Sequence, residues 1–188
     1  MTTNTHEHLI ATTRQWLERA VIGLNLCPFA KAAYVKQRVR FTVSDATTDE
    51  ALLDDLILAL QHLHAADPAE CETTLLIHPH ALTDFLDYND FLDAADAALD
   101  ALGLTGVIQV ASFHPQYQFS GTEPDDIENY TNRAPYPLLH LLREDSIEQA
   151  VESYPDVDDI PARNIAALKK LGHAGWARLQ LDGTAAAE

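Results

Sequence analysis

The segment from Ser112 to Pro137 concentrates side chains that could take part in chemistry. It holds an imidazole, side-chain amides, a phenol and a guanidinium, carried by His114, Gln116, Asn132, Tyr117 and Arg133. Long connections in compact domains are usually functional or disordered, and this one is too aromatic for disorder. We therefore predict a binding or catalytic loop here, with a structural surface loop as the alternative.

A second candidate is Cys27, which directly precedes Pro28. Proline is favoured at the first position of a helix, so this order predicts Cys27 at the N-cap. A helix N-terminus stabilises a thiolate and lowers the thiol pKa, and Lys31 lies one turn further on. The alternative is a buried cysteine that packs as a small hydrophobic side chain.

The first functional hypothesis combines these residues into an enzyme that carries out acyl or amide-group transfer. Cys27 would be the nucleophile and His114 its base. The amides of Asn25, Gln116 and Asn132 and the phenol of Tyr117 would contact and orient the substrate. Between Arg40 and Arg163 the only basic residues other than histidine are Arg133 and Arg143. Each could pair with a local carboxylate or hold a small anionic substrate through a carboxylate or phosphate group.

The second hypothesis is a metal site. The apolar run from Thr73 to His78 predicts a buried strand that ends in His78-Pro79-His80. In extended backbone, residues i and i+2 point the same way, so both imidazoles could converge with His114. Cys27 or Glu123 could complete a site for a divalent transition metal such as zinc, iron or copper. Polar capping of the strand end and substrate contact by His78 are the alternatives.

The third hypothesis is a non-catalytic binding or assembly protein. Aromatic residues are enriched at protein interfaces, and the loop 113–137 carries Tyr117, Phe119, Tyr130 and Tyr136.

Helices and strands alternate along the chain. Apolar residues with helical spacing predict helices over 8–24, 49–65, 83–102, 145–153 and 161–172. Short apolar or alternating runs predict strands over 38–44, 73–78, 107–111 and 138–143. This alternation predicts a single α/β domain over residues 8–181, with about four short, mostly parallel strands and helices on both faces. Residues 1–7 and 182–188 are expected to be flexible ends.

The predicted sheet also suggests where a site would form. Ligands of such sheets bind beyond the carboxyl ends of the strands, where His78 and His114 would meet if their strands are parallel.

Composition narrows the class of protein. The chain has 188 residues and a formal net charge of -17, which argues against nucleic acid and anionic membranes as partners. No apolar stretch approaches the roughly 20 residues of a membrane span, and the polar N-terminus is not a signal peptide, so a cytoplasmic location is expected. The two cysteines, Cys27 and Cys71, are too few for a disulfide framework.

Three motifs resemble a known family. They are Gly-Leu-Asn-Leu-Cys-Pro-Phe-Ala over 23–30, Phe-His-Pro-Gln-Tyr-Gln-Phe over 113–119 and Asn-Arg-Ala-Pro-Tyr-Pro-Leu-Leu-His-Leu-Leu-Arg-Glu over 132–144. In combination they resemble the bacterial DUF1415 family, over roughly residues 8 to 172. Because the family is one of unknown function, the resemblance implies no activity, cofactor or site residue.

Overall fold

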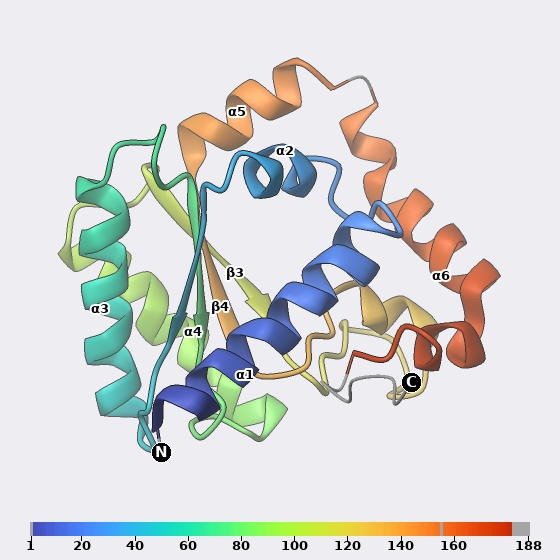
Figure 1. Ribbon diagram of the computed structural model, residues 1–188, viewed down its shortest axis with the longest axis horizontal. Coiled ribbons are helices and arrows are strands. Elements are labelled where there is room, and N and C mark those ends of the chain that lie inside the picture. Colours follow the sequence, from blue (N-terminus) through green and yellow to red (C-terminus); the bar gives the residue numbers. More distant parts are fainter. Residues whose placement is uncertain (1, 155, 182–188) are drawn as a thin grey trace.

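The computed structural model describes residues 2–154 and 156–181 and arranges them around a four-stranded sheet (Figure 1). The strands are β1 (Val39–Val43), β2 (Thr73–Ile77), β3 (Ile108–Phe113) and β4 (Leu138–Arg143). The α-helices are α1 (Thr2–Trp16), α2 (Ala30–Val35), α3 (Asp49–Ala65), α4 (Phe85–Ala101), α5 (Glu144–Glu152) and α6 (Ile160–Ala177). Shorter helical segments are the π-helix η1 (Leu17–Ile22) and the 3-10 helices η2 (Ile127–Thr131) and η3 (Val157–Asp159). Within the described residues, no helix has both the length and the apolarity needed to cross a membrane.

The two longest crossover helices form where apolar spacing and capping residues agree. The inner face of α3 is fully buried and consists of Leu52, Leu56, Leu60 and Leu63. Thr48 Oγ1 accepts the N–H of Ala51 at the start of α3. The carboxylate of Asp84 accepts the N–H groups of Leu86 and Asp87 at the start of α4. These caps satisfy first-turn donors that have no partner inside the helix, and both helices are confirmed close to their predicted limits.

The sheet is mixed, with strand order β1-β2-β4-β3. β1 and β2 are parallel, whereas β4 is antiparallel to both β2 and β3. The prediction of four strands is confirmed, but the prediction that they are mostly parallel was wrong. The connection 114–137 turns the chain back at the edge where β3 ends, so β4 enters the sheet in the opposite direction. β1, β2 and β3 still share one direction, and their carboxyl ends lie at one edge of the sheet.

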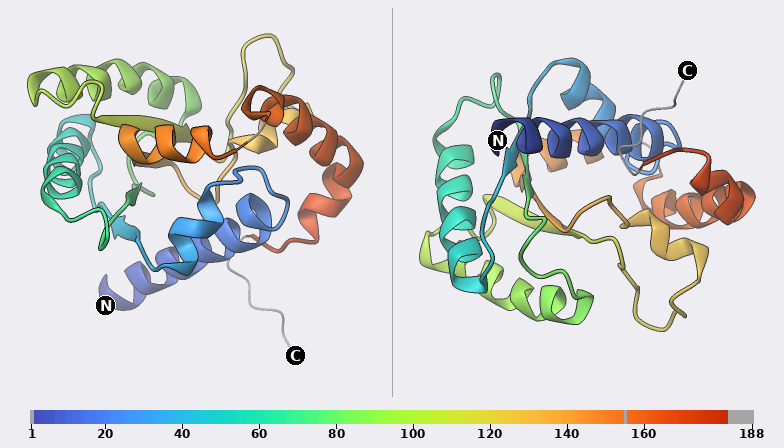
Figure 2. Two further views of the ribbon diagram at one scale, coloured as in Figure 1. Left: turned by 90° about the horizontal axis from the view of Figure 1, so that it is seen from above. Right: turned by 60° about the horizontal axis from the view of Figure 1, so that its bottom comes forward.

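Helices cover both faces of the sheet (Figures 1 and 2). α3 and α4 pack on one face, around Leu76, Leu139 and Leu141. Helix α1 and its continuation η1 cross the other face, around Leu75 and Leu138. Neighbouring residues of a strand point to opposite faces, which explains why Leu75 and Leu76 belong to different cores.

The first helix begins earlier than predicted. α1 begins at Thr2, whereas the apolar spacing predicted a helix from residue 8. His6 Nε2 lies 2.7 Å from Asp45 Oδ1, which ties this first turn to the segment after β1. The expected flexible end over residues 182–188 lies outside the described residues.

Candidate functional site

His78 and His114 follow β2 and β3 and lie at the same edge of the sheet, as predicted. His78 Nδ1 is 3.0 Å from the carbonyl oxygen of Ala81, which can only accept, so Nδ1 carries the proton. His114 Nδ1 accepts the N–H of Gln116 at 3.0 Å, and its Nε2 donates to the carbonyl of Leu82 at 3.2 Å. Both ring nitrogens of His114 are therefore bonded to the backbone, and neither offers a free lone pair to a nucleophile.

The ring of Tyr88 packs against both imidazoles. It stacks on His78 with centroids 5.8 Å apart and lies 5.1 Å from the ring of His114. Burial lowers the pKa of His78 to about 4 and also lowers the pKa of His114, so both rings are neutral at pH 7. The carboxyl edge is thus a packed aromatic cluster rather than an open site.

The three-histidine metal site is not formed. Pro79 and His80 lie in a turn, which breaks the alternation of the strand and leaves His80 exposed. Within the described ranges 2–154 and 156–181, no group of three or more His, Cys, Asp or Glu side chains, Cys27 and Glu123 included, could hold a metal ion. The prediction failed because it extended the strand geometry two residues too far.

Arg133 holds the loop 114–137 together. Its Nε donates to the carbonyl of Tyr117 at 3.2 Å and its Nη2 to the carbonyl of Pro124 at 2.6 Å. The guanidinium also lies 4.3 Å from the ring centre of Tyr130. These contacts join distant parts of the loop to one another, which explains the polar composition of this segment.

The guanidinium of Arg143 likewise donates its hydrogen bonds to backbone carbonyls. Its Nε donates to the carbonyl of Cys71 at 3.2 Å, and its Nη2 donates to the carbonyls of Leu63 and Ala66. Two of these carbonyls belong to the last turn of α3 and the residue after it, where a cation complements the helix dipole. The donors that we predicted for an anionic substrate are therefore largely occupied.

The remaining predicted substrate contacts are exposed or are engaged in contacts within the protein. Asn25 is exposed and has a φ of 54°, a left-handed conformation that asparagine tolerates and that turns the chain after η1. Asn132 Nδ2 donates to the carbonyl of Ser112 at 3.0 Å. Gln116 is exposed, and the ring of Tyr117 packs 5.1 Å from that of Phe85.

Cys27 lies on the opposite side of the sheet from His114. It packs with the α1–η1 core, whereas His114 contacts Tyr88 in the core under α4. The N-cap of α2 is Phe29, not Cys27, because the N–H of Ala30 bonds back to the carbonyl of Cys27 and closes a turn before the helix. Burial raises the Cys27 pKa, although backbone N–H groups of Phe29 and Ala30 act in the opposite direction.

Cys27 instead faces a cavity of about 970 Å³, which we call the sheet-face pocket. The pocket lies between the α1-covered face of the sheet, η1, α2 and α5. Residues that characterise its wall are Trp16, Cys27, Leu75, His140, Ile147 and Tyr154. Its size falls in the range of small-molecule sites, and most of its lining side chains are apolar, as is usual for such sites.

A π-helix forms one wall of this pocket. Leu17 and Val21 of η1 line the pocket, as does Trp16 directly before it. π-helical turns inside α-helices are rare and occur frequently at functional sites. This backbone feature is a second reason to treat the sheet-face pocket as the candidate site.

His140 is the functional candidate that sequence reasoning missed. It lies in β4, faces the sheet-face pocket, and is the neighbour of Leu75 in the β2–β4 register. Its Nε2 lies 2.7 Å from Thr73 Oγ1, and burial lowers its pKa to about 4. The signal was present in the order Leu-Leu-His-Leu-Leu over 138–142, because an imidazole inside an apolar strand must have a partner or a ligand.

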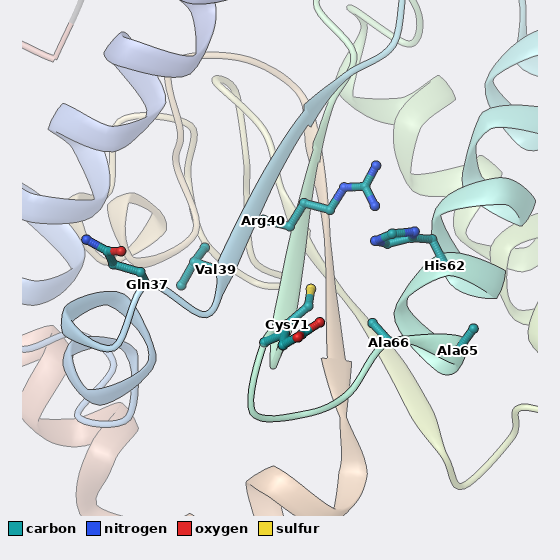
Figure 3. A pocket seen from close by; sticks show the side chains of 8 residues that line it. Gln37, Val39, Arg40, His62, Ala65, Ala66 and Cys71 are labelled. Atoms are coloured by element: carbon teal, nitrogen blue, oxygen red, sulfur yellow. The ribbon is translucent and has the colours of Figure 1, made fainter.

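A second hollow, of about 530 Å³, opens beside β1 and the end of α3 (Figure 3). Arg40 and His62 extend toward it from opposite sides, and Cys71 lies at its floor. Arg40 and His62 are both exposed, so a ligand between them would remain hydrated. This hollow is therefore the weaker candidate.

Comparisons with known proteins give one match. The family model described as "Protein of unknown function (DUF1415)" matches residues 8–178. No curated protein and no solved structure matches the chain.

Proposed function

The chain belongs to the DUF1415 family, and we propose that it binds a small, mainly apolar molecule in the sheet-face pocket. The observation that carries this proposal is a cavity of about 970 Å³ on the sheet, lined mostly by apolar side chains, with the imidazole of His140 among the polar groups of its wall. A pocket whose wall is mostly apolar suits a ligand that is held by burial and oriented by hydrogen bonds to the polar groups among its lining residues.

The elements around the pocket support a small ligand rather than a macromolecule. The pocket is bounded by the sheet below and by η1, α2 and α5 around it, so a ligand would be enclosed on several sides. Phe29 beside α2 and Tyr154 after α5 meet edge to face, with ring centroids 5.6 Å apart, and narrow the space between these helices. A protein partner would need a more open surface than this.

A fluorescent probe tests the proposal. N-phenyl-1-naphthylamine is apolar, carries one N–H group and becomes fluorescent in apolar sites. We expect saturable binding by the wild-type protein, and an affinity lower by at least about tenfold in Ala150→Trp, which fills the pocket from α5. The matched control is Ala97→Trp on the exposed face of α4, which should bind as the wild type does. Equal binding by both variants would show that the probe occupies another place.

A second candidate function is a thiol enzyme for acyl or amide-group transfer that uses this pocket. It is favoured by the backbone N–H groups of Phe29 and Ala30, which act on Cys27 Sγ and would stabilise charge on the sulfur during a reaction. His140 lines the same pocket and would take the place that we first gave to His114 as base. Because burial raises the pKa of Cys27, the resting group would be a thiol.

An acylation burst tests this second candidate. With p-nitrophenyl acetate, we expect release of about one equivalent of p-nitrophenol as Cys27 is acylated. The burst should disappear in Cys27→Ala and persist in Cys71→Ala, because Cys71 is buried elsewhere. A burst that persists in Cys27→Ala, or none in the wild type, would remove thiol catalysis at Cys27 from consideration.

A further inference from the structure

The hydroxyl group of Thr73 determines where His140 carries its proton. Thr73 Oγ1 lies 2.6 Å from the carbonyl oxygen of Leu141 and 2.7 Å from His140 Nε2. A carbonyl oxygen can only accept, so the single hydroxyl proton of Thr73 must point to Leu141. The same oxygen can then only accept from the imidazole, which means that His140 Nε2 is protonated.

A neutral imidazole that is protonated at Nε2 has a lone pair at Nδ1. Burial lowers the pKa of His140 to about 4, so the ring is neutral near pH 7. His140 lines the sheet-face pocket, and no hydrogen bond within the described residues reaches its Nδ1. The polar group that the protein offers to a ligand on this part of the wall is therefore an acceptor.

We infer that the sheet-face pocket selects ligands that present a hydrogen-bond donor, such as a hydroxyl or neutral N–H group, to Nδ1 of His140. Thr73 is the positioning residue that fixes this preference. The inference rests on the proposed function, and it defines the ligand class within it. An ether or ketone at the same position would place an acceptor against a lone pair and leave both unsatisfied.

The charges on the pocket wall give a carboxylate little compensation. The guanidinium of Arg143 donates to backbone carbonyls, as described above. Arg38 Nη1 lies 3.8 Å from Glu72 Oε2, and Lys36 is exposed at the rim. A buried carboxylate facing Nδ1 would lack a pairing cation there, which is costly in an apolar site. A neutral donor is therefore favoured over the anionic ligand that the sequence led us to expect.

Three matched compounds test the ligand class by displacing N-phenyl-1-naphthylamine from the wild-type protein. They are 1-naphthol, a donor; 1-methoxynaphthalene, which has lost the donor; and 1-naphthoate, an anion. We expect 1-naphthol to displace the probe at concentrations about tenfold or more below those of the ether, as one hydrogen bond to a buried acceptor implies. We expect 1-naphthoate to be weaker than 1-naphthol.

Thr73 variants separate positioning from simple contact. Thr73→Ser keeps the hydroxyl and should keep the preference for 1-naphthol over the ether. Thr73→Val removes it, so the proton of His140 can move to Nδ1 and the preference should fall to within about threefold. A nitrogen-15 spectrum of the histidine rings, with His140 assigned from His140→Gln, should show the Nε2–H form in the wild type.

The outcomes distinguish this inference from the proposed function. Displacement by the ether or the carboxylate as readily as by 1-naphthol would overturn the inference and leave the binding function standing. A wild-type spectrum with His140 protonated at Nδ1 would overturn it as well. If neither the probe nor any of the three compounds bound, the proposed function would fail and this inference with it.

Discussion

The hydroxyl group of Tyr88 is inserted between the strands β3 and β4 where their pairing ends. It accepts the N–H of Phe113 at 3.0 Å and donates to the carbonyl of Leu138 at 2.8 Å, two residues that face each other in the register. The ring below it stacks on His78 and packs against His114. One side chain thus both joins the strands and organises the histidines at the carboxyl edge, which gives these histidines a structural role.

We predict that Tyr88→Phe destabilises the fold by about 2–4 kcal/mol, because it leaves a buried N–H and a buried carbonyl without their shared partner. Tyr88 is fully buried, so water cannot replace the hydroxyl. Urea unfolding followed by circular dichroism measures the change. Tyr34→Phe is the matched control: its hydroxyl bonds to Glu18 at the surface, and we expect a loss below about 1 kcal/mol. Equal losses in both variants would contradict this role of Tyr88.

Sequence alone placed His78 and His114 at one edge of the sheet but could not assign their chemistry. A helix that connects two strands of one sheet makes them run in the same direction, and this put His78 and His114 at one edge. Which ring nitrogen is free depends on partners such as Ala81 and Leu82, whose carbonyls are brought there by turns that no pattern predicts. His140 was overlooked because its importance depends on the cavity it faces, and a cavity is a property of several packed elements.

Helix α5 is the most loosely held wall of the sheet-face pocket. None of its residues is buried, although Ile147 and Ala150 face the pocket. It follows β4 without a connecting loop, and directly after it Tyr154 packs against Phe29 on the other side of the pocket. Arg163 Nη1 donates to the hydroxyl of Tyr154 at 2.6 Å and holds it from α6. The Phe29–Tyr154 pair therefore joins the segments that precede α2 and follow α5 at the wall of the pocket.

We predict that Phe29→Ala accelerates both the entry and the release of N-phenyl-1-naphthylamine, by about threefold to tenfold, as expected for the loss of one aromatic pair. Stopped-flow fluorescence measures both rates. A variant that only loses a contact with the ligand would release it faster without faster entry. Phe119→Ala is the control, because Phe119 packs on Tyr117 in the loop 114–137 and should leave both rates unchanged.

The elements themselves were largely predictable, and their arrangement was not. Apolar spacing and capping side chains located α3, α4 and all four strands. The direction of β4 could not be read from residues 138–143, because a mostly apolar strand looks the same in a parallel and an antiparallel sheet. The direction of β4 depends on the connection 114–137, which is filled by its own side chains. It contains no crossover helix, which is the usual connection to a parallel strand.

At the scale of the whole molecule, neutral buried histidines make the fold sensitive to mild acid. His78 and His140 lie on opposite sides of the sheet, and burial lowers the pKa of each to about 4, from an ordinary value of 6.5. Between these two pKa values His78 and His140 bind a proton in the unfolded chain but remain neutral in the folded chain. Stability is therefore greatest above the ordinary pKa and falls as the pH decreases toward 4. His114, whose pKa is also lowered, contributes in the same direction.

We predict that lowering the pH from about 7.5 to about 5 costs about 2 kcal/mol of unfolding free energy for each of His78 and His140. Most carboxylates remain ionised in this interval, so the acidic composition contributes less than the histidines. Replacing His78 by Asn keeps a side-chain donor for the carbonyl of Ala81 and removes the titration. The loss between the two pH values, measured by urea unfolding, should then be smaller by about 2 kcal/mol than in the wild type. His64→Asn, on the exposed face of α3, is the control and should lose as much unfolding free energy between the two pH values as the wild type. If His78→Asn lost as much as the wild type, His78 would have to accept a proton in the folded protein.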